Sequence, residues 1–399
     1  MDAQAAVDRV WRADAAGMLG VLTRRLGDFG RAEDALQDAL AEALRRWPVD
    51  GVPDSPAGWL VTTAWRRALD GLRREATGRD KLATLLVTEA PAGEPTDEDR
   101  LALVFGCCHP ALPVSAQVPL TLRAVCGLST AEIAAAYLVP EATIAQRLVR
   151  ARRVLADREV PFDLPDPDDY PTRLPAVLAV VYLVFNEGYL ASGPATPQRR
   201  DLAREAVTLA RQLAVLMPGE PEVGGLTALL ELNEARAATR FDSWGRLVPL
   251  EEQDRSRWNR PAIDAAVHRL GRAVAQGRIG RYQLEAGIAA QHAVAASYAG
   301  TRWAAIRGLY DQLYAVQPSP VVLLSRAVAT RYVTGPAQAL AEVEALGERL
   351  SGYRLFHATR AELLRACGRT DEAREATRRA LALATNPAER ELLARRLAG

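Results

Sequence analysis

Side chains that could contact nucleic acid follow one side of a helical pattern in residues 128 to 155, LSTAEIAAAYLVPEATIAQRLVRARRVL. An arginine guanidinium can bind guanine O6 and N7 through two hydrogen bonds, and a glutamine amide can bind adenine similarly. The residues with suitable donors share one arc of the predicted helix: Thr143, Gln146, Arg147, Arg150 and Arg153. This arc predicts a surface for the major groove of DNA, although a solvated arginine face on an ordinary helical hairpin has the same pattern.

The opposite arc of the same predicted helix is apolar. Leu148, Ala151 and Leu155 fall within about 40° of Ile144 on a helical wheel, which predicts a narrow packing face. The preceding predicted helix, 129–137, begins with the capping-box pattern STAE. A buttress helix followed by a short turn and a second helix is the arrangement of a helix-turn-helix.

An acidic stripe marks the segment RAEDALQDALAEALRRWP. Asp34, Asp38 and Glu42 recur every fourth residue, so they lie on one face of the predicted helix together with Gln37. Because these carboxylates repel phosphate, the stripe suits a basic protein surface better than nucleic acid. A solvated helix face is the alternative interpretation.

Aromatic and basic residues alternate in the next helical segment, AGWLVTTAWRRALDGLRRE. Its arginines, Arg66, Arg67, Arg73 and Arg74, could hold backbone phosphates, and tryptophan rings can stack on unpaired bases. Packing in a helical core is the alternative for Trp59.

The triplet Cys107-Cys108-His109 invites a zinc hypothesis. Adjacent residues on a helix point in diverging directions, and no second pair of ligands follows at a suitable spacing. We therefore predict buried packing for this triplet, and no metal site.

The motif VFNEGYLAS places Asn186, Glu187 and Tyr189 at the end of an apolar run. Unsatisfied polar groups are costly in such a run, so we expect Asn186 and Glu187 to bond neighbouring helix ends. Contact with a ligand or with the N-terminal domains is the alternative.

Composition favours several all-α domains. The chain has 399 residues, is rich in alanine, leucine and arginine, and has few β-branched runs. Its net charge of +1 excludes a protein-wide field for attracting DNA. The four cysteines lack CxxC spacing, and no signal peptide or membrane-spanning stretch is evident, which predicts a soluble, cytoplasmic protein without a membrane partner.

Prolines, glycines and acidic residues divide the chain into predicted segments. The predicted domains are 1–75, 100–158 and 173–399, joined by linkers at 76–99 and 159–172. Within the last domain, similar segments begin at Gly300, Gly335 and Gly368, 35 and 33 residues apart. This period predicts a TPR-like α-solenoid, clearest at 300–390.

Several ordered motifs resemble the sigma-70 family. EIAAAYLVPEATIAQRLVRAR is similar to the helix-turn-helix of the family's fourth conserved region, and AEDALQDALAEALRRW resembles its second region. FGCCHPAL, YLVPE, AQRLVRAR and VFNEGYLAS resemble a narrower group, the extracytoplasmic-function (ECF) factors with a C-terminal TPR-like extension. The resemblance covers essentially the whole chain.

The resemblance implies three surfaces of a transcription initiation factor without an enzymatic activity or a cofactor. Asp34, Gln37 and Asp38 would bind the clamp helices of the largest subunit of core RNA polymerase. The arginine arc of 141–155 would read the -35 promoter element, with Arg152, Arg153 and Arg158 available to phosphates. The -10 element would be held by the loop 49–56 and by Trp59, Thr62, Trp65, Arg66, Arg67 and Arg73.

The resemblance also implies that the C-terminal extension modulates activity and takes a protein or peptide ligand. Leu138 stands where family members have a turn glycine. Two other function classes remain: a TPR adaptor that binds protein only, and a conventional helix-turn-helix regulator. No nucleophile-base pair, phosphate loop or metal spacing supports an enzyme built from Glu187 and one of His268, His292 or His357.

Overall fold

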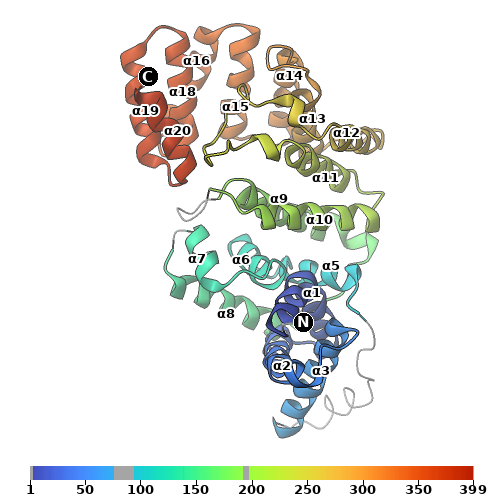
Figure 1. Ribbon diagram of the computed structural model, residues 1–399. Helices are drawn as coiled ribbons and strands as arrows, with labels where there is room; N and C mark the ends of the chain where they lie inside the picture. Colours follow the sequence, from blue (N-terminus) through green and yellow to red (C-terminus); the bar gives the residue numbers. More distant parts are fainter. Residues whose placement is uncertain (1–2, 76–93, 138, 192–196, 399) are drawn as a thin grey trace. The chain divides into compact units, whose positions relative to one another are not determined.

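The computed structural model describes residues 3–75, 94–137, 139–191 and 197–398, which form two compact units, Met1–Val184 and Phe185–Gly399 (Figure 1). Every regular element in the described ranges is a helix, apart from an isolated bridge between Phe241 and Leu247. The all-α prediction is confirmed. Leu138 and residues 76–93 of the predicted first linker lie outside the described residues.

Three long helices open the first unit: α1 (Ala3–Leu26), α2 (Phe29–Asp50) and α3 (Pro56–Glu75). The Asp28 side chain caps α2 by accepting a hydrogen bond from the Arg31 backbone N–H at 3.0 Å. Gly51 ends it with a φ of 85°, a conformation that favours glycine. Apolar residues from the three helices share a core: Met18, Leu22, Leu36, Trp47, Leu60 and Trp65.

Four shorter helices follow in the same unit: α5 (Asp97–Cys107), α6 (Val114–Ala124), α7 (Thr130–Tyr137) and α8 (Glu141–Asp157). A capping box between Thr96 and Asp99 starts α5, so this helix begins three residues before the predicted Arg100. The capping box predicted for STAE is confirmed, because Ser129 and Glu132 exchange hydrogen bonds at 2.8 and 3.1 Å.

Close contacts join these two groups of helices. At Gly20 a Cβ atom would lie 2.2 Å from the Asp99 carbonyl oxygen, so only glycine allows α1 and α5 to approach this closely. Arg24 pairs with the buried Asp99 carboxylate at 2.6 Å. The ring of Phe29 at the start of α2 stacks on Phe162, with centroids 6.0 Å apart.

A short 3₁₀ turn, η1 (Pro167–Asp169), leads into α9 (Tyr170–Tyr189), which starts inside the predicted second linker of 159–172. Proline fits the first turn of a helix because its missing N–H has no partner there, so Pro171 does not delay the start. Arg173 Nη2 donates to the Phe105 carbonyl at 3.0 Å and ties the start of α9 to the end of α5.

The second unit holds the remaining helices: α10 (Arg200–Leu216), α11 (Pro221–Glu234), η2 (Ala237–Thr239), η3 (Arg255–Arg257), α12 (Arg260–Val274), α13 (Arg281–Val294), α14 (Trp303–Val316), α15 (Pro320–Val333), α16 (Pro336–Glu344), α17 (Gly347–Leu350), α18 (Arg354–Ala366), α19 (Thr370–Leu383) and α20 (Pro387–Ala398). Gly300, Gly335 and Gly368 precede α14, α16 and α19, which are the second helices of three successive hairpins. The predicted period therefore corresponds to one helical hairpin per repeat.

Helix α20 returns to the beginning of the second unit. Asn386, which is 1% exposed, caps α20 and donates through Nδ2 to the carbonyl oxygens of Ala191 at 2.8 Å and Pro197 at 3.1 Å. Arg354 on α18 holds Glu389 of α20 through two contacts of 2.9 and 3.0 Å. The first and last segments of this unit are thus joined.

Candidate functional site

Helix α8 has the predicted division into an apolar and a polar face. Ile144, Leu148, Ala151 and Leu155 are all buried, at 4% exposure or less, so the predicted packing face is confirmed. On the other arc Gln146, Arg150 and Arg153 are exposed, and Thr143 and Arg147 are half-buried. Arg153 pairs with the exposed Asp157 on the same helix at 3.5 Å, and this exposed pair leaves the arginine open to competition by phosphate. The arc therefore presents donors of the kind that a helix in the major groove uses.

One arginine of α8 does not belong to this surface. Arg152 forms an ion pair with Glu33 of α2 and lies over the Phe29 ring, 5.6 Å from its centroid. Arg123 of α6 binds the same carboxylate, with its Nε 3.3 Å from Glu33 Oε1. The expectation that Arg152 is available to phosphates is wrong, because the side chain neutralises a carboxylate whose side chain is only 10% exposed.

Helix α3 presents its arginines but not its second tryptophan. Trp65 is 1% exposed and is among the largest fully buried side chains, so its assignment to the DNA-contacting set is corrected: the ring is core. Its neighbour Arg66 is exposed and makes no ion pair with any residue that the structure describes. The contact of Arg66 with DNA stays a prediction, and only the burial of Trp65 is decided by the structure.

The remaining predicted residues of α3 stay on or near its surface. Trp59 is half-buried and meets Trp47 edge to face, with centroids 5.6 Å apart, and Thr62 is half-buried. Arg73 pairs with Asp70 at 3.2 Å, and Arg67 pairs with Glu42 on α2. Both pairs are exposed, so phosphate can compete for these arginines at low cost.

The acidic stripe of α2 is partly neutralised. Glu42 is bound by Arg67, and that hydrogen bond lowers the pKa of its carboxyl below the ordinary value. Asp34, Gln37 and Asp38 are exposed together one and two turns earlier, and they pair with no other described residue. The face that remains is a compact acidic patch suited to a basic protein surface.

Relatives of the chain fall into two groups. An uncharacterised protein of Rhizobium meliloti, R00370, is 45% identical over 381 residues, which cover 93% of this chain and 90% of that protein. A probable ECF RNA polymerase sigma factor SigI of Mycobacterium tuberculosis is 28% identical over 163 residues, covering 39% of this chain and 56% of its own. The ECF RNA polymerase sigma factor SigK of Mycolicibacterium vanbaalenii is 29% identical over 147 residues, 35% of this chain and 74% of its own.

Family models place these similarities on the helices described above. Residues 11–77 match the family described as Sigma-70 region 2, and residues 103–155 match Sigma-70, region 4. The chain therefore carries both conserved regions of the sigma-70 family, in sequence order, and the named relatives over this part of the chain are ECF factors. Region 2 spans most of α1 to α3, and region 4 runs from within α5 to within α8.

A third match lies beyond the two sigma regions. Residues 173–274 match a family of unknown function, DUF6596. The hairpin repeats marked by Gly300, Gly335 and Gly368 follow this match. No described helix is long and apolar enough to cross a membrane.

The two cysteines of the Cys107-Cys108-His109 triplet are buried as predicted, and His109 is half-buried. Both thiols are fully buried, and Cys108 Sγ lies 3.7 Å from the Thr121 hydroxyl. Burial raises the pKa of Cys108 to about 12, which leaves this thiol protonated and unreactive at neutral pH. His109 accepts a hydrogen bond from the Ala111 backbone N–H through Nδ1 at 3.1 Å.

The VFNEGYLAS motif closes a helix pair inside the second unit. A Cβ atom on Gly188 would lie 2.2 Å from the Ala203 backbone nitrogen, so α9 and α10 touch there. Tyr189 stacks on Phe185 at 5.4 Å and is covered by the Arg240 guanidinium, 3.5 Å from its ring centroid. Asn186 is exposed and Glu187 is half-buried, so the bonds that we expect them to make with neighbouring helix ends stay a prediction.

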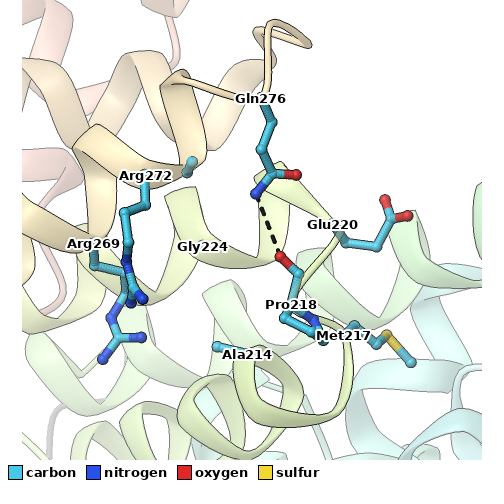
Figure 2. Close-up of a pocket in the computed structure, with 9 residues that line it drawn as sticks. Ala214, Met217, Pro218, Glu220, Gly224, Arg269, Arg272 and Gln276 are labelled. Atoms are coloured by element: carbon cyan, nitrogen blue, oxygen red, sulfur yellow. Dashed lines mark hydrogen bonds between the residues drawn. The ribbon is translucent and has the colours of Figure 1, made fainter.

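A cavity of about 260 Å³ lies between α10, α11 and α12, and its lining includes three charged residues, Glu220, Arg269 and Arg272 (Figure 2). Arg269 binds Glu231 at 3.1 Å, and Glu220 lies 3.7 Å from Arg278. Gln276 donates to the Pro218 carbonyl at 3.3 Å, the dashed line in Figure 2. These bonds hold the ends of α10 and α12 together.

Sequence reasoning missed Glu33, which carries the contact between region 2 and region 4. Glu33 stands next to the exposed Asp34 in an acidic segment, and this neighbourhood does not indicate burial. One sequence signal could have found it: on a helical wheel of α2, Glu33 falls on the apolar side, near Leu36 and Phe29.

Proposed function

We propose that the protein is an ECF sigma factor, which binds core RNA polymerase and directs it to promoters with two recognised elements. Asp34, Gln37 and Asp38 would hold the polymerase clamp helices. Thr143, Gln146, Arg147, Arg150 and Arg153 would read the -35 element. Trp59, Thr62, Arg66, Arg67 and Arg73 would contact the -10 element, and the extension would modulate activity as a TPR-like module.

The observation that carries this proposal is the exposed donor arc of α8 above a fully buried apolar stripe. A helix anchored in this way can enter a groove without unfolding its own core, and its arginine forks match guanine. The neighbouring Arg66 and the acidic patch of α2 supply the second DNA contact and the protein contact. Electrostatics supports this division, since phosphate repels carboxylates and attracts arginines.

Run-off transcription with purified core RNA polymerase tests the proposal. The template is the DNA upstream of the protein's own gene cluster, and the full chain is compared with an Arg147→Ala/Arg150→Ala variant. We expect promoter-specific transcripts from the full chain and a loss of at least tenfold in the variant, because each bidentate contact contributes about 1–3 kcal/mol.

A matched control is Arg374→Ala/Arg379→Ala, which removes two exposed arginines from α19 in the second unit. This control should transcribe like the unchanged chain. Promoter binding that needs no core polymerase would indicate a conventional helix-turn-helix regulator. Absence of both core binding and transcripts would favour a TPR adaptor. The same assay with residues 1–160 alone shows whether the C-terminal extension activates or inhibits: more transcript than from the full chain means that it inhibits, and less means that it activates.

The acidic patch gives a second prediction. An Asp34→Lys/Asp38→Lys variant should bind core polymerase at least tenfold more weakly, because like charges then face the basic partner surface. Both residues are exposed and unpaired among the described residues, so circular dichroism should be unchanged. Equal affinity of variant and unchanged chain in a titration with core enzyme would place the polymerase contact elsewhere.

A further inference from the structure

A second cavity of the extension, about 190 Å³ in volume, lies where segments distant in sequence converge. Helices α15, α18 and α20, found in Figure 1 toward the C-terminus, form part of its wall together with two loops. The residues that matter for its chemistry are Leu250, Glu251, Tyr298, Arg331, Tyr332 and Leu363.

Two tyrosines form a rigid aromatic wall in this cavity. Tyr332 remains 38% exposed although its ring stacks on Trp303 with centroids 4.0 Å apart. Its hydroxyl shares a hydrogen bond of 3.0 Å with the Tyr298 hydroxyl. That bond uses one hydroxyl proton, so the other can donate to a ligand. Burial raises the pKa of Tyr298, which keeps this hydroxyl a donor.

Two opposite charges in the cavity wall lack partners. Arg331 and Glu251 form no ion pair with each other or with any residue in the described part of the chain. The Arg331 guanidinium lies 5.4 Å from the centroid of the Tyr332 ring, and both charges act on the Tyr298 hydroxyl. Elsewhere in the same wall Arg396 binds Glu362 at 2.8 Å. The cavity of Figure 2 differs in that its one unpaired charge among the described residues, Arg272, has no unpaired charge of opposite sign beside it in the lining.

We propose that this cavity binds a small zwitterion, a free amino acid or a short peptide with an apolar side chain. The carboxylate would meet Arg331 and a tyrosine hydroxyl, the ammonium group would meet Glu251, and the side chain would lie on Tyr332 and Leu363. The four charged residues in the wall sum to zero, which disfavours a ligand with net charge such as phosphate. The volume lies below the about 300–1,000 Å³ typical of drug-sized ligands, so one or two residues would fill it.

Isothermal titration calorimetry of the full chain tests the inference with four probes. L-leucine and leucyl-leucine carry both charges, N-acetyl-leucine lacks the ammonium charge, and leucinamide lacks the carboxylate. We expect one of the two zwitterions to bind. If the free amino acid is the ligand, N-acetyl-leucine and leucinamide should each bind about 10- to 100-fold more weakly than leucine. If leucyl-leucine is the ligand, its N-acetylated and amidated forms should show the same loss.

Two variants identify which residue meets which charge. Arg331→Gln should lower the affinity for the zwitterion to that of its amide and leave amide binding unchanged. Glu251→Gln should lower the affinity for the zwitterion to that of its N-acetylated form and leave the binding of the N-acetylated form unchanged. The control Arg374→Gln, at an exposed position on α19, should change neither.

The inference is overturned if neither zwitterion binds at millimolar concentration, or if Arg331→Gln and Glu251→Gln leave the affinities unchanged. Because the titration uses neither polymerase nor DNA, its outcome is independent of the transcription assay. Circular dichroism of both variants should match the unchanged chain, since neither residue holds an intramolecular ion pair in the described ranges.

Discussion

Trp65→Ala should lower the local free energy of unfolding of α1 to α3 by about 3–5 kcal/mol, the cost of removing a fully buried aromatic side chain. The ring is 1% exposed, and it shares the core with Leu22 and Leu60. Hydrogen exchange of peptides from these helices, measured in the full chain, gives the local stability without assuming a single unfolding transition.

The neighbouring Arg66→Ala is the matched control, because Arg66 is exposed on the same helix. It should change local stability by no more than about 0.5 kcal/mol while reducing promoter opening. If Trp65→Ala instead leaves exchange unchanged and abolishes promoter opening, the ring acts at DNA and the core assignment is wrong.

Glu33→Gln should loosen the contact between region 2 and region 4. The Glu33 side chain is 10% exposed and is paired with Arg123 and Arg152, whose side chains are 26% and 29% exposed. We expect a loss of about 1–2 kcal/mol, less than for a fully buried pair, because both arginines can turn to water. Faster hydrogen exchange in α2 and α8 would report this loss.

The same variant should strengthen promoter complexes with core polymerase. Under the proposed function the two DNA elements are centred near positions -35 and -10, about 25 base pairs or roughly 85 Å apart at about 3.4 Å per base pair. Helices α2 and α8 have 22 and 17 residues, so their lengths of about 33 and 25 Å together fall short of this distance, and we expect their contact to break on such a promoter. Glu33→Gln weakens this contact in advance by about 1–2 kcal/mol. The apparent affinity of the complex with core polymerase for the promoter should therefore rise about 5- to 30-fold.

Glu344→Gln controls for loss of a carboxylate, since Glu344 pairs with Arg360 in the second unit at 3.2 Å. It should leave exchange in α2 and α8 and promoter affinity unchanged. Weaker promoter complexes with Glu33→Gln would mean that the contact supports the active form.

Local patterns predicted the helices and several of their faces. The STAE capping box, the buried stripe from Ile144 to Leu155 and the burial of Cys107 and Cys108 all follow from neighbours within about one or two helical turns. The all-α class likewise follows from composition and period. Helical periodicity is a property of the chain itself, so it can be read without knowing what each helix packs against.

Long-range packing decided the rest. Trp65 belongs to the core because three helices enclose it. Arg152 does not join the DNA-facing arc because it pairs with Glu33, a residue 119 positions earlier in the chain. Asn186 is exposed despite its apolar neighbours in sequence. The cavity with Glu251 and Arg331 needs helices from separate repeats. The sequence by itself determined which helices form and which side chains could do chemistry. Only the tertiary structure decided which of those charges are already paired, because pairing depends on distances between residues remote in sequence.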